Sequence, residues 1–195
     1  MPNNLDFALK HLNEHLTQPG DFFPLVILKR KKENPDMDRG VQVIKHINVY
    51  HAEQLEISFP TLQLVCEQER ARLYMRCNKR SDPEISTAMV RYVVDKHLNR
   101  EFSTMGNAYT HVVGITPAKG PKQCMIDVDQ GDSLEDAIKA LRLASHGKQV
   151  VEFQQVPSVS GVHVITPAFD VKLFAEHCKC MTSNDGDFIV YCPNI

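Results

Sequence analysis

The chain has 195 residues, of which 43% are hydrophobic and 24% charged, and its net charge is -2 at pH 7. Length and composition predict one compact domain, 1–195, with enough chain for a hydrophobic core. The slightly negative charge argues against a protein that coats nucleic acid over an extended surface, although it is compatible with a local basic groove. Since there is no long apolar run, we expect no membrane-spanning segment and no membrane partner.

The compartment is inferred from the start of the chain and from its cysteines. The opening Met-Pro-Asn-Asn-Leu-Asp lacks the basic and apolar segments of a secretory signal. The 6 cysteines lie mostly in apolar strand or helix contexts, so reduced thiols in a cytoplasmic protein are the simpler interpretation. His177-Cys178-Lys179-Cys180 has the wrong spacing for a paired-cysteine zinc knuckle. We therefore expect a cytoplasmic protein.

Residues 1–120 predict an N-terminal α/β half. Apolar residues at helical spacing between Leu5 and Leu16 indicate an opening amphipathic helix. Ser81-Asp82-Pro83-Glu84 is a good helix start, with proline near the first helical position. The expected elements, in chain order, are a helix over 5–16, strands over 23–28 and 41–50, a helix over 52–69 with a break at Pro60, a strand over 72–77, a helix over 81–98 and a loop over 102–119.

Residues 121–195 predict alternating strands and helices. The expected elements are a strand over 125–129, a helix over 134–144 capped by Asp132 or Ser133 and ended at 146–148, a strand starting at 150–153, a turn over 157–161, a strand over 162–166, a helix over 170–177 capped by Asp170, and a last strand over 188–192. This β-α-β-β-α-β order is that of the ferredoxin-like or split βαβ unit. The predicted fold class is therefore α+β, a ferredoxin/RRM-like C-terminal unit packed with an N-terminal α/β layer.

The predicted topology brings polar side chains together. Asp127 and Asp129 are separated by one residue on a strand, so both carboxylates project from one face. We expect the first and third strands to lie side by side and parallel, with His163 next to Asp127. The last strand, antiparallel to the first, brings Asp185 and Asp187 toward the same edge. These polar positions, separated in sequence, are therefore predicted to converge on one edge of one sheet face.

The residue types at this site indicate metal-dependent chemistry on phosphates. Two carboxylates on one strand face can share a hard divalent cation through their oxygens. A histidine after a glycine-containing turn suits phosphate or nucleotide binding beside such a cation. Taken singly, each signal has an ordinary structural interpretation: alternating acids often face solvent, and a lone histidine is often a hydrogen-bonded structural residue. Because these residues occur in the expected order along one βαββαβ pattern, the metal-site interpretation is favoured over the structural one.

Two sequence phrases resemble the catalytic core of archaeo-eukaryotic primases and primase-polymerases, including the polymerase module of bacterial end-joining ligases. Met125-Ile126-Asp127-Val128-Asp129 matches that superfamily's first motif, and Gly161-Val162-His163 matches its second. Either Ser158 or Ser160 fills the small polar position of the second motif. The third motif places an acid on the last strand, whereas 188–192 contains none, so Asp185 or Asp187 must serve from the preceding turn. The resemblance covers residues 121–195.

The resemblance implies a primase-like nucleotidyl transferase acting in DNA replication. Its cofactor would be Mg²⁺ or Mn²⁺, and its partners a nucleoside triphosphate, a DNA or RNA template, and a helicase or other replication protein. The catalytic residues would be Asp127, Asp129 and His163. The metal ligands would be Asp127, Asp129, Asp185 and Asp187. The residues implied to contact nucleotide are Ser158, Ser160, Gly161, His163, Arg76, Lys79 and Arg80.

A second interpretation is a non-catalytic RRM-like module that binds nucleic acid or a protein, with acids that only solvate the sheet. Few aromatic residues occupy the expected open face, which argues against base stacking of the kind RRMs use. The densest basic run, Lys29-Arg30-Lys31-Lys32, is either a solvated loop or a nucleic-acid contact. Divalent-ion binding at Asp127 and Asp129 separates the two interpretations.

Overall fold

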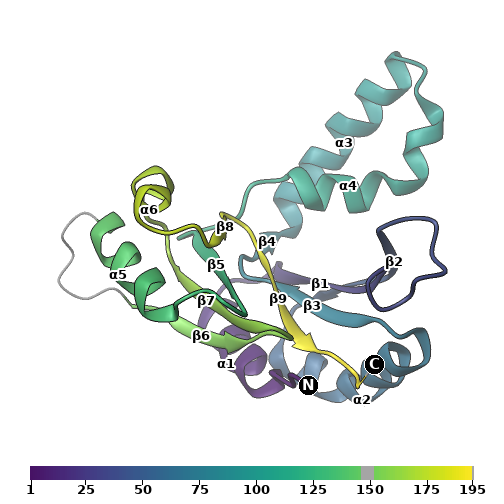
Figure 1. The fold of residues 1–195 in the computed structure, drawn as a ribbon. Helices are drawn as coiled ribbons and strands as arrows, with labels where there is room; N and C mark the ends of the chain where they lie inside the picture. Colours follow the sequence, from purple (N-terminus) through teal and green to yellow (C-terminus); the bar gives the residue numbers. More distant parts are fainter. Residues whose placement is uncertain (146–151, 195) are drawn as a thin grey trace.

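The computed structural model describes residues 1–145 and 152–194 as an α+β fold with two sheets (Figure 1). The larger sheet has the strand order β2-β1-β3-β9, with β4 paired to β1, and the smaller has the order β6-β7-β5-β8. Every strand pair in both sheets is antiparallel. The expected α+β class is therefore observed. None of the helices in these residues combines the length and the apolar character that a membrane crossing needs.

The first part of the chain forms most of the larger sheet and a helical arm. Its elements are α1 (Leu5–His15), β1 (Asp21–Arg30), β2 (Val41–Val49), α2 (Ala52–Glu69), β3 (Arg72–Arg76), β4 (Arg80–Ser81), α3 (Asp82–Leu98), the 3₁₀ helix η1 (Phe102–Asn107) and α4 (Ala108–Ile115). Two expectations are wrong. Helix α2 runs through Pro60 without a break, since Phe59 and Leu62 on either side are buried in the core. The expected loop over 102–119 contains η1 and α4, which is anchored by buried Val112 and Val113.

The second part of the chain forms the smaller sheet and returns to the larger one. Its elements are β5 (Gln123–Asp129), α5 (Leu134–Ala144), β6 (Gln154–Pro157), β7 (Gly161–Pro167), α6 (Val171–His177), β8 (Met181–Ser183) and β9 (Asp187–Tyr191). Both predicted helices are confirmed, with the side chains of Ser133 and Asp170 as their N-caps. The predicted helix end at 146–148 and the start of the strand at 150–151 lie outside the described residues, and the described strand begins at Gln154.

The strand connections differ from the prediction in two ways. The first and third strands, β5 and β7, are neighbours as expected, but they are antiparallel because β6 and β7 form a hairpin that reverses the chain. The predicted last strand forms as β9 but pairs with β3 in the larger sheet, and three-residue β8 takes its expected place beside β5. Strand β9 is retained there because Phe188 and Val190 are buried in the same core as α1 and α2.

One hydrophobic core joins the two sheets. Helices α1 and α2 pack on the larger sheet, and this core also takes in Val156 and Ile165 from the smaller sheet. A second core lies between the smaller sheet and helices α5 and α6, around Ile126, Leu141 and Phe174. Figure 1 shows α5 and α6 beside the smaller sheet and the α3–α4 arm projecting away from both sheets. Where the two sheets face each other, residues of β5, β7, β3 and β9 line a polar site.

Gly161 permits the close approach of β7 to β5. A Cβ at this position would lie 1.9 Å from the backbone oxygen of Val128 on the neighbouring strand. We expect Gly161→Ala to lower the free energy of unfolding by about 3 kcal/mol or more, because backbone rather than a side-chain tip must move. Denaturant unfolding measures this loss.

Gly114 in α4 supplies the matched control, because a Cβ there meets no atom within 4 Å. Gly114→Ala should be neutral or raise the free energy of unfolding by about 0.5–1 kcal/mol through helix propensity. An unfolding midpoint of Gly161→Ala equal to that of the unaltered protein would contradict the argument.

Candidate active site

The site is built on directly opposed residues of β5 and β7. Asp127 faces His163 across the strand pair, and Asp129 faces Gly161. Opposed residues of an antiparallel pair project to the same side of the sheet, so the expectation that Asp127 and His163 share adjacent strands and one face is confirmed. The Nε2 atom of His163 lies 3.5 Å from Oδ1 of Asp127. This distance is longer than a hydrogen bond and leaves both groups available to a third.

A polar cavity of about 240 Å³ brings most of the predicted residues together. It lies where the smaller sheet meets β1, β3 and β9 of the larger one. Ser160 closes one side by donating a hydrogen bond of 2.9 Å from Oγ to Oδ1 of Asp129. The predicted site residues in the lining are Asp127, Asp129, Ser158, Ser160, His163 and Asp187. Acids from two separate sheets therefore share one cavity.

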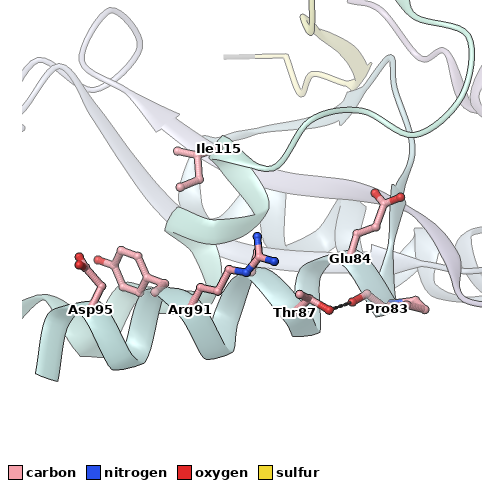
Figure 2. Close-up of a pocket in the computed structure, with 8 residues that line it drawn as sticks. Pro83, Glu84, Thr87, Arg91, Asp95 and Ile115 are labelled. Atoms are coloured by element: carbon pink, nitrogen blue, oxygen red, sulfur yellow. Dashed lines mark hydrogen bonds between the residues drawn. The ribbon is translucent and has the colours of Figure 1, made fainter. Parts of the chain in front are cut away.

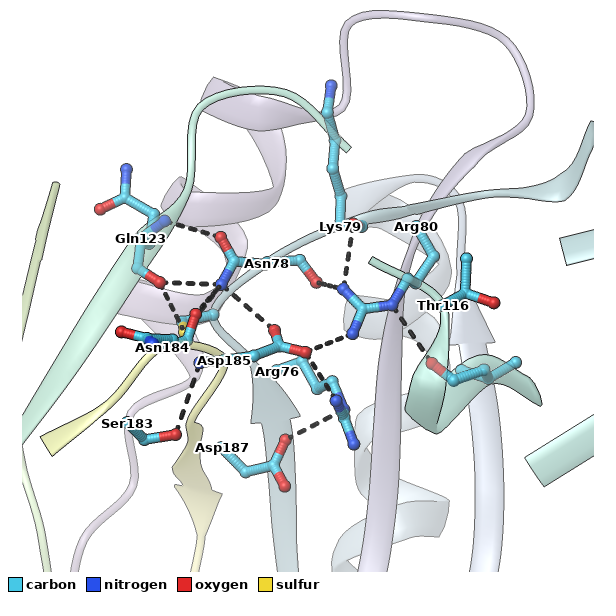
Figure 3. A network of polar contacts seen from close by, with 12 residues as sticks. Arg76, Asn78, Lys79, Arg80, Thr116, Gln123, Ser183, Asn184, Asp185 and Asp187 are labelled. Atoms are coloured by element: carbon cyan, nitrogen blue, oxygen red, sulfur yellow. Dashed lines mark hydrogen bonds and ion pairs between the residues drawn. The ribbon is translucent and has the colours of Figure 1, made fainter. Parts of the chain in front are cut away.

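Asp185 has a different environment from Asp187, although both were predicted metal ligands. Its carboxylate is paired with the guanidinium groups of Arg76, at 2.7 Å, and Arg80, and it accepts a hydrogen bond from Asn78 (Figure 3). Asp187 lies at the start of β9, with Oδ1 3.6 Å from Nε of Arg76. Asp187 thus faces the cavity, and Asp185 is held within the neighbouring network of Figure 3.

The three predicted nucleotide-binding cations are engaged outside this cavity. Arg76 pairs with Asp185 and Asp187, and the fully buried Arg80 pairs with Asp185. Lys79 pairs with Asp21 at 2.7 Å and donates to the backbone oxygen of His15. Their contacts hold strands and loops together.

Other cations line the cavity and were not predicted at this site. Arg30 and Lys32 come from the end of β1 and the residues after it, and Arg72 comes from β3. The guanidinium groups of Arg30 and Arg72 both lie 3.4 Å from the hydroxyl of Tyr74. The basic run 29–32 was a visible signal, but its position opposite β5 depends on the β1–β3 pairing, which the sequence does not reveal.

Burial shifts the proton affinities in the cavity. Burial raises the pKa of Asp127, and Asp129 adds to the rise, while His163 and Arg30 oppose it. Burial lowers the pKa of His163, opposed by Asp127 and Asp129, and it raises the pKa of Asp187, opposed by Arg76. The imidazole of His163 is therefore biased toward its neutral form, in which one ring nitrogen donates and the other accepts.

Several polar atoms of the cavity are buried without a hydrogen bond. They are Oδ1 of Asp127, Oδ1 of Asp187, Nδ1 of His163 and Nε of Arg72. Most buried polar atoms in folded proteins have a partner, so orphaned atoms on residues that line one cavity need an explanation.

The donor set fits one kind of divalent ion. Carboxylate oxygens are the ligands that Mg²⁺ and Mn²⁺ prefer, and Asp127 and Asp187 each offer an oxygen without a hydrogen bond. In residues 1–145 and 152–194, no group of three or more His, Cys, Asp or Glu side chains is already placed to hold a metal ion. A Mg²⁺ ion that keeps waters and is shared with substrate phosphates needs only one or two carboxylates. The residues therefore fit an ion that binds together with a phosphorylated substrate.

A larger cavity, about 660 Å³, lies on the helical arm (Figure 2). It runs along α3 beside Ile115 at the end of α4, with Glu84, Arg91 and Asp95 at its border. Its lining is mainly apolar, and the described acids and histidine of β5, β7 and β9 are remote from it. The smaller, polar cavity is therefore the candidate site.

Comparisons of the chain with models of protein families, with curated proteins and with solved structures found no match. Function is therefore inferred from the geometry of the site.

The two acids of the 185–187 turn should respond differently to neutralisation. We expect Asp185→Asn to lower the free energy of unfolding by about 3 kcal/mol, because it leaves the buried guanidinium of Arg80 without its counter-charge. Asp187→Asn should change stability by less than about 1 kcal/mol, since burial already favours the neutral form of this carboxyl. Chemical denaturation of both variants is the measurement. Equal losses would show that the two acids share one structural role.

Proposed function

We propose that the chain is a primase-like nucleotidyl transferase that uses a divalent metal and nucleoside triphosphates on a nucleic-acid template. The observation that carries the proposal is the composition of the 240 Å³ cavity: Asp127, Asp129 and Asp187 share it with Arg30 and Lys32, while Arg72 in the same lining is ion-paired with Glu33. Carboxylates suit a hard cation, and guanidinium and ammonium groups suit phosphate oxygens. A triphosphate bound with its metal ion needs both.

The strand arrangement supports the same proposal. The elements β5-α5-β6-β7-α6-β8 follow the β-α-β-β-α-β order, and their strands lie in the order β6-β7-β5-β8. This is the arrangement expected of a ferredoxin/RRM-like unit. With Asp127 and Asp129 on its first strand and His163 on its third, the unit carries the polar residues at the positions that the primase resemblance implies.

In the proposed reaction, a 3′-hydroxyl attacks the α-phosphorus of the nucleoside triphosphate, and pyrophosphate leaves. Asp127, Asp129 and Asp187 would hold a Mg²⁺ or Mn²⁺ ion, which when bound would supply charge stabilisation and help to activate the hydroxyl. Neutral His163 donates one N–H to a phosphate oxygen, and Ser158 or Ser160 donates a hydroxyl. Arg30 and Lys32 offset the charge of the phosphates at the cavity wall. Because catalysis is positioning and charge stabilisation, no protein nucleophile is required.

The direct experiment is nucleotide incorporation by the full chain with Mn²⁺ or Mg²⁺, labelled nucleoside triphosphates and single-stranded DNA or RNA. Template-dependent extension that requires the metal is the expected result. Ribonucleotides and deoxyribonucleotides are supplied separately, with and without a primer, because this defines the substrate. Metal-independent binding of nucleic acid without incorporation would favour the non-catalytic module.

Mn²⁺ binding should depend on the acid pair of β5. We expect Mn²⁺ to bind weakly alone and more tightly with a nucleoside triphosphate, because the described carboxylates supply only part of its ligand set. Asp127→Asn combined with Asp129→Asn should abolish triphosphate-dependent Mn²⁺ binding and leave the fold intact, since it removes like charges from one face. Calorimetric titration with and without triphosphate tests this. Unchanged Mn²⁺ binding in the double variant would make these acids ordinary surface residues.

His163→Ala should weaken nucleoside-triphosphate binding and spare metal binding by the acids. A hydrogen bond to a charged phosphate contributes about 1.5–3 kcal/mol, so the affinity should fall about ten- to a hundredfold. His97→Ala, at an exposed position on α3, is the matched control and should leave affinity unchanged. Melting curves check that His163→Ala is folded. A folded variant with full triphosphate affinity would remove His163 from the proposed site.

A further inference from the structure

Helix α3 of the helical arm carries an apolar surface that nothing in the described part of the chain covers. The helix has 17 residues, and in the described structure Ile85 is the one that is buried. Val90, Val94 and Leu98 are 66%, 51% and 75% exposed. Helices in proteins gain most of their stability from packing an apolar face, and a row of exposed apolar side chains marks a surface for interaction.

These three exposed residues form one ridge of α3. Side chains four residues apart follow one another along a helix, so the ridge extends over about 12 Å of its length. Met89 and Tyr92 of the same helix pack with the buried residues of α4. With 3.6 residues per turn, the ridge lies on the side of α3 that is turned away from α4.

The 660 Å³ cavity of Figure 2 lies beside this ridge. It is lined on α3 by Ala88 and Tyr92, and on α4 by the exposed side chain of Ile115. An apolar ridge next to an apolar groove is a self-complementary surface, because each of two identical copies can place its ridge in the groove of the other. Ridges of residues four apart pack in this way at a crossing angle of about −50°.

Arg91 and Asp95 give the same surface a two-fold pattern of charge. Figure 2 shows both side chains on the side of α3 that faces the groove. In an antiparallel pair with its two-fold axis near Val94, Val94 meets its own copy and Val90 lies near Leu98. The same axis brings Arg91 of each copy within reach of Asp95 of the other, whereas a parallel pair would put like charges at the same height. Charge complementarity therefore favours a second copy of the chain in the antiparallel direction.

We propose that the chain forms a homodimer through α3, with the two copies of this helix antiparallel. The ridge of each copy occupies the groove of the other, and Arg91 pairs with Asp95 of the second copy at both ends of the interface. The arm projects away from both sheets (Figure 1), so this pairing uses no residue of the candidate active site. The dimer is independent of the function proposed above.

The test is sedimentation of the full chain over a range of micromolar concentrations. We expect a reversible equilibrium between the 22.1 kDa chain and a species of twice that mass, because a pair of helices buries less surface than a permanent dimer. Val94→Glu should weaken dimerisation at least about a hundredfold, since it places two like charges at the two-fold axis. Ile57→Glu, at an exposed position on α2, is the control and should dimerise as the unaltered protein does. A monomer at every concentration, or full dimer affinity in Val94→Glu, would overturn the proposal.

Charge reversal tests both the partner and its direction. Arg91→Asp and Asp95→Arg, made separately, should each weaken dimerisation about tenfold, because each places like charges at both ends of the interface. The two single variants should form a heterodimer when they are mixed, and a variant with both changes should recover the affinity of the unaltered protein. Melting curves check that each variant is folded. Full affinity in the folded single variants, or no heterodimer on mixing, would show that α3 does not pair in this way.

Discussion

The relative position of the two sheets depends on an ion pair between buried Arg80 and half-buried Asp185 and on the neighbouring side chain of Asn78 (Figure 3). The Asn78 amide donates to the backbone oxygen of Gln123 at 2.8 Å and accepts from its N–H at 2.7 Å. It also donates to the 184–185 turn. One short segment after β3 therefore fixes both the start of β5 and the turn before β9. Asp127 and Asp187 lie on those two strands, so the cavity that they share depends on this contact.

A charge pair in this position is a matter of specificity more than of stability. Removing the charge of Arg80, and part of that of Asp185, from water costs desolvation free energy. A well-packed apolar pair often stabilises a protein equally well. An apolar contact, however, would tolerate a shift of one strand relative to the other. The guanidinium of Arg80 also donates to the backbone oxygens of Asn78, Lys79 and Val113, which leaves it few alternative positions. The geometry of the polar cavity benefits from that restriction.

Local patterns in the sequence predicted the parts of the fold that are determined locally. The helix over 134–144 was predictable because its apolar spacing and its cap at Ser133 lie within one stretch of chain. That Asp127 and His163 lie on adjacent strands followed from the βαββαβ order, but the direction of those strands did not, because they were expected to be parallel and are antiparallel. Strand β8 was not predictable, because Met181-Thr182-Ser183 is short and polar and pairs only through the tertiary fold.

The site residues also divide into those that local sequence patterns indicate and those that depend on contacts with distant segments. Asp127, Asp129 and His163 were found because the strand pattern carries them, and Ser158 and Ser160 because the resemblance to the primase motif implied one of them. The difference between Asp185 and Asp187 was not predictable, because it arises from Arg76 and Arg80 in a distant segment. Arg30 and Arg72 were missed at the site for a related reason: their approach to β5 requires the packing of one sheet against the other, for which a single sequence contains no local signal.

The return of the chain to its first sheet has a consequence for biosynthesis. Strand β9 borders β3, and it also pairs with the opening residues, since the N–H of Asn4 donates to the oxygen of Val190 at 2.8 Å. A nascent chain emerges from the ribosome with α1, β1, β2 and β3 first. Until β9 follows, β3 has an unpaired edge of the kind that recruits other chains into aggregates. The larger sheet can therefore be completed only after residues 187–191 have been translated, and a chain that stops before residue 187 loses an edge strand and a cavity acid together.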